Sequence, residues 1–259
     1  MHTQRPTANF STPPADLTLK DNADTRPAPA RPVRAPRAMR KFQIAYLDRD
    51  GLPCWTDQIA PAHPVFESAF SAFAHGVPIA TPDGPVAVQD LVPGMRITTA
   101  TRGPMQVLWI GAMTLVPQMP GANVAAGRMT RVMPESFGLG RPDSNLMAGP
   151  GARMLARPPG MDHGLGRERL LIPAQDLVDG MNVIEVAPQR PITLYHLALR
   201  QHSILRAAGI EMESFHPGVA FERRMGHNMV TLFLSLFPHI SEPGDFGKTA
   251  CPRIDLPQV

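Results

Sequence analysis

Histidines and cysteines are the side chains of this sequence best suited to acid–base, nucleophilic or metal chemistry. The chain of 259 residues contains nine histidines and two cysteines, Cys54 and Cys251, which lie far apart and lack the spacing of a zinc site. Five histidines are scattered without ligand spacing: His63, His75, His163, His216 and His239. We therefore expect no bound metal, and we favour two separate thiols over a disulfide.

Motifs of common cofactor-dependent and hydrolytic enzymes are absent. The sequence has no Gly-x-Ser-x-Gly elbow, no P-loop and no Gly-x-Gly-x-x-Gly fingerprint, so it indicates no cofactor. The formal net charge is +3, and no RNA-binding or helix-turn-helix signature accompanies this mild excess of positive charge. We therefore expect no specific nucleic-acid partner.

The pattern of apolar residues predicts a mainly β fold. The chain has 30 prolines and 21 glycines, and such frequent interruption favours short strands and turns over long helices. Residues 41–64 predict a β-hairpin extension turning at Asp50-Gly51, and residues 65–74 predict a short helix. Further short strands are predicted at 86–88, 95–99, 107–110, 169–172, 183–186 and 193–199, whereas residues 117–168 show few periodic apolar positions.

The two ends of the chain differ in composition from its centre. Residues 1–40 are rich in Pro, Ala and Arg and predict a disordered tail. Within it an arginine recurs at every third position: Arg31, Arg34, Arg37 and Arg40. In a polyproline II conformation these would line one face and could contact an anionic partner, although a solvated linker is the favoured interpretation.

Residues 219–259 predict a C-terminal helix followed by an irregular tail. The unbroken apolar run from Asn228 to Phe237 predicts one buried helix that ends before Pro238. No apolar run is long enough to span a bilayer, and the first thirty residues lack a signal-peptide core. We expect a cytoplasmic protein, with export independent of an N-terminal signal left open.

Three blocks of the sequence resemble the Hedgehog/intein (Hint) domains of bacteria. The first is Gly76 to Gly111, in which Gly76, Ile79, Thr81, Gly84, Val88, Leu91, Pro93, Gly94, Val107, Trp109, Ile110 and Gly111 match in order. The others are Leu170 to Gly180, and Tyr195 to Gly218 with His196, His202, Gly209, Glu213, Ser214 and Phe215 in place. The resemblance extends over about residues 65–218, the expected Hint-like domain.

This resemblance implies both a fold and a chemistry. The fold is a disc-like domain of short strands with two pseudo-twofold halves. In active members a Cys, rarely Ser, begins the domain and attacks the carbonyl of the preceding residue, which converts a peptide bond into a thioester. A histidine from a central Ser-Pro-x-His-Arg block assists the departing nitrogen as a general acid. The thioester is then resolved by water or another nucleophile.

The present chain departs from the family at both reactive positions. Counting back from Gly76, the position of the nucleophile falls on Ala72. The central block is Gly149-Pro150-Gly151-Ala152-Arg153, so that Ala152 occupies the position of the histidine. Alanine supplies neither a nucleophile nor a proton. The resemblance therefore implies a domain that has lost its self-cleaving chemistry.

Three other residues remain candidates for residual chemistry. Ser71 lies one residue before the nucleophile position, which on a strand turns its side chain to the opposite face. His202 matches a family histidine and is interpreted either as a retained assistant or, preferably, as a packed and hydrogen-bonded residue. The pair His227-Asn228 imitates the end of an intein, but Met229 follows it and Asn is also a common helix cap, so splicing is not expected.

Three functional hypotheses follow. The favoured one is an inactive Hint domain that serves as a binding or scaffold module. The second is an autoprocessing protein whose nucleophile, near residues 70–72, has not been recognised. The third is a β-rich protein that contacts an unknown protein partner through its basic tail and its C-terminal helix. The first predicts an intact chain, and the second predicts two fragments.

Overall fold

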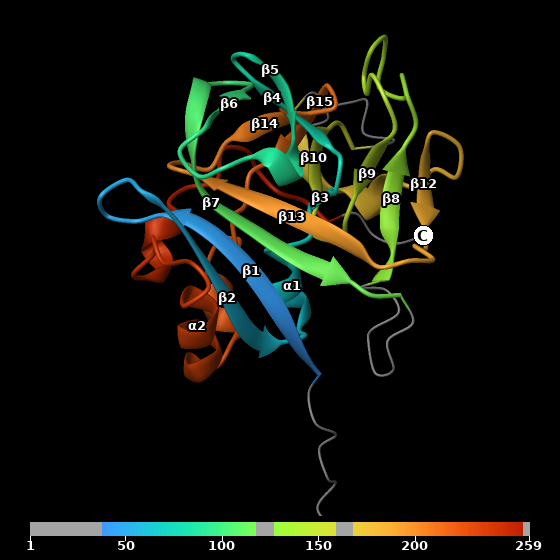
Figure 1. The fold of residues 1–259 in the computed structure, drawn as a ribbon. Coiled ribbons are helices and arrows are strands. Elements are labelled where there is room, and N and C mark those ends of the chain that lie inside the picture. The colour runs from blue at the N-terminus through green and yellow to red at the C-terminus, as the bar shows by residue number, and fades with distance from the viewer. Residues whose placement is uncertain (1–37, 118–126, 159–167, 256–259) are drawn as a thin grey trace, which may run out of the picture. The chain divides into compact units, whose positions relative to one another are not determined.

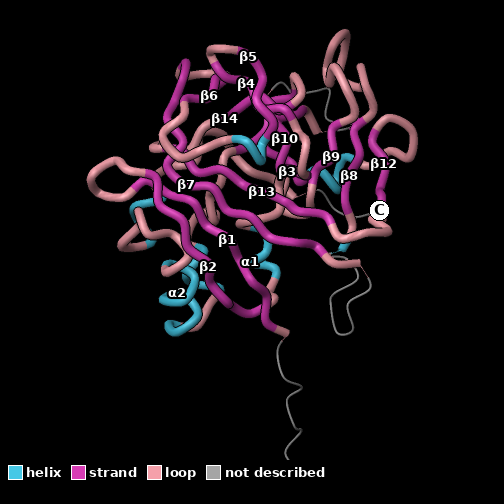
Figure 2. The backbone as a smooth tube through the Cα atoms, in the orientation of Figure 1, coloured by secondary structure: helices cyan, strands magenta, loops and turns pink. Residues whose placement is uncertain are grey.

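A computed structural model of the chain describes residues 38–117, 127–158 and 168–255, and these residues form a mainly β fold (Figures 1 and 2). This confirms the predicted fold class. The strands are β1 Met39–Leu47, β2 Pro53–Pro61, β3 Phe73–Ala74, β4 Pro78–Thr81, β5 Gly84–Ala87, β6 Arg96–Thr99, β7 Gly103–Leu115, β8 Met129–Val132, β9 Leu146–Ala148, β10 Arg153–Ala156, β11 Leu170–Pro173, β12 Val183–Val186, β13 Ile192–Leu199, β14 Ile204–Ala207 and β15 Ile210–Glu213.

Helices are few in the described ranges. The α-helices are α1 Pro64–Ser68 and α2 His227–Leu234, and the 3₁₀ helices include η1 Val88–Asp90, η4 Ala174–Leu177, η5 Phe221–Arg224 and η6 Pro243–Phe246. None of the helices that the structure describes is long and apolar enough to cross a membrane.

The described strands join into one continuous antiparallel network. Its order is β11-β10-β15-β14-β6-β7-β13-β3-β9-β8-β12, with β4 on β14 and β5 on β4. β7 is the longest strand and pairs with β13 over most of its length, so these two strands form the centre of the sheet (Figure 1). The N-terminal hairpin adds to the same sheet, because β1 pairs with both β2 and β7.

The hairpin forms as its sequence predicts. Phe42 and Ile44 face the core, and Gly51 provides the left-handed turn with a φ of 77°. The strand starts earlier than expected, however, at Met39. Arg40, assigned to the tail by its sequence, therefore lies in β1, where its Nε donates to Glu67 at 2.5 Å. Arg31, Arg34 and Arg37 lie outside the described residues, so the expected anionic partner of this segment stays a prediction.

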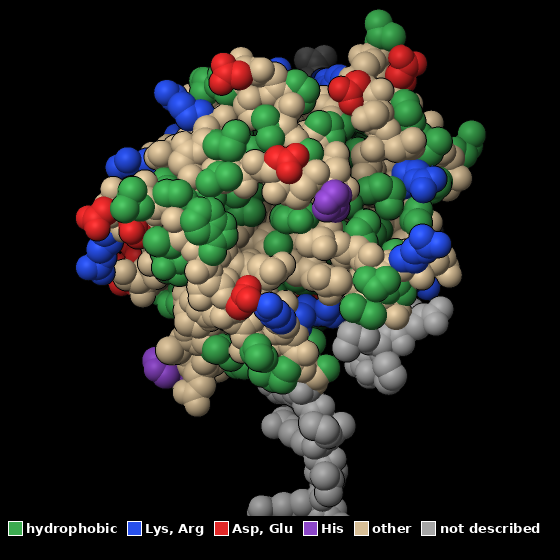
Figure 3. All heavy atoms as spheres, in the orientation of Figure 1, with side chains coloured by type: hydrophobic (Ala, Val, Ile, Leu, Met, Phe, Trp, Pro, Cys, Tyr) green, Lys and Arg blue, Asp and Glu red, His purple; other side chains and the backbone are tan. Residues whose placement is uncertain are grey.

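Along β2, exposed and partly buried side chains alternate. Trp55 and Ile59 are 67% and 69% exposed, respectively, and lie on the same side of the strand. Figure 3 shows hydrophobic side chains scattered among polar ones on the face of the molecule drawn there. Single exposed apolar residues of this kind are normal on protein surfaces, and they mark no site by themselves.

Aromatic side chains from three parts of the sequence share one core. Phe70, which precedes the Hint-like blocks, packs at ring-centroid distances of 4.5 Å from Phe42 and 5.2 Å from Trp109. Phe66 in α1 lies 5.6 Å from Phe233 in α2. The Trp109 indole also donates to the carbonyl of Leu236. The N-terminal hairpin and the C-terminal helix are therefore built into the fold rather than appended to it.

Several local predictions need correction. The helix expected over 65–74 ends at Ser68, because the following residues must turn to pair with β13 and β9. The C-terminal helix is confirmed, although it ends at Leu234, and Gly226 rather than Asn228 is its N-cap. Residues 117–168, which gave no strand signal, contain β8, β9 and β10. Each of these strands has only three or four residues, too few to show a period.

Candidate functional site

The peptide bond between Ser71 and Ala72 lies in the centre of the fold. Both residues are buried. The N–H of Ala72 donates to the carbonyl of Tyr195 at 2.9 Å, and the carbonyl of Ala72 accepts from the N–H of Gly149 at 2.9 Å. The carbonyl oxygen of Ser71 accepts from the N–H of Gly151 at 3.0 Å. The two sequence blocks expected to hold the reactive groups are thus brought together around this bond.

Two glycines allow this close approach. A Cβ on Gly149 would stand 2.2 Å from the carbonyl oxygen of Ser71, and a Cβ on Gly151 would stand 2.2 Å from the carbonyl oxygen of Ser68. Real Cβ atoms do not occur at such distances, so side chains at these positions would force the backbone apart. The family has Ser where this chain has Gly149. The segment around Pro150 is therefore packed against residues 68–71 more closely than a serine at position 149 would allow.

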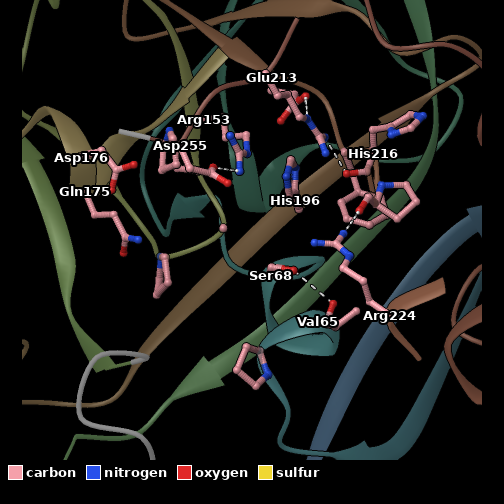
Figure 4. A pocket seen from close by; sticks show the side chains of 18 residues that line it. Val65, Ser68, Arg153, Gln175, Asp176, His196, Glu213, His216, Arg224 and Asp255 are labelled. Atoms are coloured by element: carbon pink, nitrogen blue, oxygen red, sulfur yellow. Dashed lines mark hydrogen bonds and ion pairs between the residues drawn. The ribbon is translucent and has the colours of Figure 1, made fainter. Parts of the chain in front are cut away.

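A cavity of about 450 Å³ opens next to this segment (Figure 4). Its lining combines α1, the central block, η4, the middle of β13, the end of β15 and the C-terminal segment: Pro64, Val65, Ser68, Pro150, Gly151, Ala152, Arg153, Pro173, Gln175, Asp176, His196, Glu213, Phe215, His216, Pro217, Arg224, Arg253 and Asp255. Ala152, the position of the missing histidine, is among them, whereas Ser71 and Ala72 are not.

His196 in β13 lines the cavity as a neutral ring. Burial lowers its pKa to about 3, so the ring carries no charge at neutral pH. Its Nδ1 accepts from the N–H of Leu197 at 3.0 Å, which places the single ring proton on Nε2. Phe73 and Phe215 pack edge-on against the ring, with centroids 5.7 and 5.3 Å away. His196 is therefore a fixed hydrogen-bond donor at its Nε2 atom.

The carboxylate of Glu213 in β15 contacts two basic side chains. Its Oε1 lies 2.8 Å from His202 Nε2 and 2.8 Å from Arg253 Nε. Burial alone would raise the pKa of Glu213, but the close contact with His202 and the charge of Arg253 outweigh it, and its pKa lies below the ordinary value. The carboxyl is thus ionised, and it holds Arg253 at the wall of the cavity.

The structure gives His202 a packed, hydrogen-bonded environment. Its Nδ1 accepts from the N–H of Ala250 at 2.7 Å, and its Nε2 lies 2.8 Å from Oε1 of Glu213 in a close contact that lacks the angles of a hydrogen bond. The ring does not line the cavity. His202 is therefore positioned to orient Glu213, and it lies outside the set of side chains that surround Ala152.

Ser71 also lacks a base. Its hydroxyl oxygen accepts from the N–H of Gly151 at 3.1 Å, and no histidine in the described part of the chain shares a hydrogen bond with it. Around the Ser71–Ala72 bond, a donor that can polarise the carbonyl is present. A nucleophile at position 72 and a proton donor at position 152 are not.

Sequence reasoning singled out the two segments that meet at the Ser71–Ala72 bond but missed most of the cavity. His196 and Glu213 were recognised only as matching residues, although β13 and its neighbours bring them to the cavity wall. Arg253 and Asp255 come from the tail judged irregular, and Arg224 lies just before the predicted C-terminal helix. Isolated arginines in such positions carry no periodic signal. Among the other histidines, His63 caps α1 through Nδ1 and His216 bonds the carbonyl of Gly247.

Comparison with known proteins agrees with the sequence blocks. The family profile of the Hint domain matches residues 71–219, which confirms the resemblance. The bacterial intein-like domain from Clostridium thermocellum is similar in structure, with a TM-score of 0.39 and 11% identity over 56% of this chain and 99% of that one. The MchDnaB-1 intein gives a TM-score of 0.35 and 14% identity over 56% and 100%. No curated protein matches the chain.

Proposed function

The chain belongs to the Hint domain family, and from this premise we propose that it is a non-cleaving member whose former reaction centre serves as a binding site. The observation that carries the proposal is the pair of empty positions. Ala72 cannot attack the carbonyl of Ser71, and Ala152 cannot protonate the departing nitrogen. Loss of the nucleophile removes the covalent step, and loss of the general acid alone lowers the rate of cleavage by about 10² to 10⁴.

The close packing around residue 71 supports the same proposal. The Gly149 and Gly151 backbones lie so near the carbonyls of Ser71 and Ser68 that there is no room for side chains between them. The adjacent cavity is lined by Ala152 and by polar side chains that could bind a ligand. The Ser71–Ala72 bond is not part of its lining.

The experiment is the denatured intact mass of the full-length protein, measured when fresh and after incubation with thiol or with hydroxylamine. We expect a single unchanged mass corresponding to 28.2 kDa in every sample. Hydroxylamine is included because it traps an ester or thioester that would otherwise revert to the amide.

The alternative is autoprocessing through an unrecognised nucleophile. The same mass spectrum distinguishes two possible cleavage sites. Attack by the Ser71 hydroxyl on the preceding carbonyl would separate the chain between Phe70 and Ser71. A nucleophile from elsewhere acting on the family position would separate it between Ser71 and Ala72. The two sets of fragments differ by one serine, and Ser71→Ala would abolish only the first. Either set would overturn the proposal.

A further inference from the structure

We propose that the cavity beside Ala152 binds an organic carboxylate, and that Arg224 and Arg253 hold its anionic end. The inference rests on the proposed function, because it assigns a ligand class to the same site. It starts from two arginines that line the cavity and whose guanidinium groups both reach Gly218, and both come from the segment that follows the Hint-domain match.

Gly218 lies next to both arginines. A Cβ built on this glycine would stand 3.2 Å from Nη1 of Arg253 and 3.4 Å from Nη2 of Arg224, so both guanidinium groups reach the same glycine. Gly218 has a φ of 99°, a conformation that disfavours side chains. The space between the arginines is therefore kept free of any side chain at position 218.

The two arginines differ in how far their donors are used. Arg253 donates from Nε to Glu213 at 2.8 Å and from Nη2 to the carbonyl of His216 at 2.6 Å, while no hydrogen bond to a described residue occupies Nη1. Arg224 has one long contact, 3.5 Å from Nη2 to the carbonyl of Pro217. Both side chains line the cavity and thus keep free N–H groups next to it, and Figure 4 shows Arg224 there.

The charges around this point favour an anion. Glu213 neutralises Arg253, and Asp255 pairs with Arg153 on another part of the wall at 2.6 Å. Arg224 forms no ion pair within the described ranges. A bound carboxylate would accept hydrogen bonds from Arg224 and from Nη1 of Arg253, and it would compensate the charge of Arg224.

The remaining walls indicate that the ligand has an apolar body. Six apolar side chains contribute to a lining that also holds polar and charged groups: Pro64, Val65, Pro150, Pro173, Phe215 and Pro217. The neutral His196 contributes a fixed donor at Nε2, as its tautomer requires. A volume of about 450 Å³ lies within the range of small-molecule sites. An inorganic anion would fill the arginine end and leave these walls without a partner.

Two sources present this chemistry, a free carboxylic acid and the C-terminal residue of a peptide. Titration calorimetry of the full-length protein separates them with two probes, benzoate and N-acetyl-alanyl-phenylalanine. The neutral matched controls are benzamide and the C-terminal amide of the same dipeptide. We expect at least one acid to bind and its neutral counterpart to bind at least tenfold more weakly. Binding of benzoate alone would indicate a free acid, and stronger binding of the dipeptide acid would indicate a peptide terminus.

Arg224→Gln tests the assigned contact, and Arg223→Gln is its matched control. Arg223 is the neighbouring exposed residue of η5, it does not line the cavity, and its substitution removes the same charge. We expect Arg224→Gln to weaken binding of the acid by about tenfold to a hundredfold, the effect of a lost charged hydrogen bond. Arg224→Lys should recover part of the loss, and Arg223→Gln should bind as the unmodified chain does.

The inference is overturned if neither acid binds at concentrations up to about 10 mM, if the neutral controls bind equally well, or if both glutamine variants behave alike. Circular dichroism of each variant shows that the fold is retained. The denatured mass of the same samples shows whether the chain is intact. Failure to bind with an intact chain overturns only this inference, whereas fragments would overturn the proposed function.

Discussion

The N–H of Gly151 points at the carbonyl oxygen of Ser71 from 3.0 Å away. An oxyanion formed at this carbonyl would meet the same donor, so one element of an acyl-transfer site is retained although the nucleophile and the general acid are gone. The retained donor now serves the structure, since it satisfies a carbonyl buried beside Gly149 and Ala152. Whether it can still support chemistry is open to direct test.

We predict that Ala72→Cys together with Ala152→His restores scission between Ser71 and Ala72. The thiol supplies the attack and the imidazole, placed at the cavity wall, protonates the leaving nitrogen. Ala72→Cys alone should cleave more slowly by about 10² to 10⁴. Denatured mass spectra over time with added thiol give both rates. The control is Ala72→Cys with Ala152→Gln, in which glutamine fills a similar space but cannot act as an acid. Equal cleavage rates for the two double variants would contradict the role given to position 152.

We predict that Gly149→Ser, which introduces the family residue, destabilises the protein by about 2 kcal/mol or more. Its Cβ would stand 2.2 Å from the carbonyl oxygen of Ser71. The free energy of unfolding in urea, followed by tryptophan fluorescence, measures the change. Gly226→Ser is the control, because nothing lies within 4 Å of its Cβ and serine is a good N-cap for α2. A neutral Gly149→Ser would show that the segment can relax.

We predict that stability falls as the pH drops from 7 to 5. The pKa of His196 is about 3 in the folded state, against an ordinary value of 6.5, so the unfolded chain binds more protons between these values and is favoured by acid. At pH 5, protonation of His196 in the unfolded chain lowers the free energy of unfolding by about 2 kcal/mol. Burial lowers the pKa of His216 to about 4, which acts in the same direction.

The variant His196→Asn isolates this contribution. An asparagine Oδ1 can accept from the N–H of Leu197 in place of Nδ1, and the side chain does not titrate. We expect it to be less stable than the unmodified chain at pH 7, because packing is lost, but to lose less stability between pH 7 and pH 5. An equal loss of stability between pH 7 and pH 5 in the variant and in the unmodified chain, measured by urea unfolding, would show that the pKa of His196 is not lowered in the fold.

We predict that Glu213→Ala destabilises the fold by about 3 to 5 kcal/mol, since it leaves Arg253 and His202 without their shared acceptor. The side chain of Glu213 is only 3% exposed, so water cannot replace the lost contacts. Asp57→Ala is the control, because its pair with Lys41 is more than half exposed on both sides, and it should change stability by less than about 1 kcal/mol. Similar losses for both variants would remove the special role of Glu213.

The sequence predicts those parts of the fold whose pattern is local. The alternation of Phe42, Ile44 and Tyr46 before Asp50-Gly51 is enough to define the first hairpin. The three-residue β9 is not predictable in this way, because it pairs through Ala148 with Phe73, a partner far away in the sequence. Such a strand exists only when the rest of the sheet is in place.

The residues of the site likewise fall into those that the local sequence reveals and those that it does not. Ala72 and Ala152 could be found because the blocks around them keep the order of the family. Arg224 and Arg253 could not, since their place depends on tertiary contacts of the C-terminal segment. The Trp109 indole binds the carbonyl of Leu236, and Leu171 pairs with Arg253. Neither contact leaves a trace in the local sequence.

The hairpin that precedes Ser71 would hold the two parts of the chain together after a cut at this residue. β1 pairs with β7 from Phe42 opposite Met113 to Tyr46 opposite Trp109, and Phe66 and Phe70 lie in the shared core. A nick between residues 71 and 72 would therefore release nothing, because the two polypeptides would remain associated without a covalent link. Native chromatography would not register such a cut. Conversely, residues 1–71 and 72–259, produced separately, should recognise each other and assemble as complementing halves.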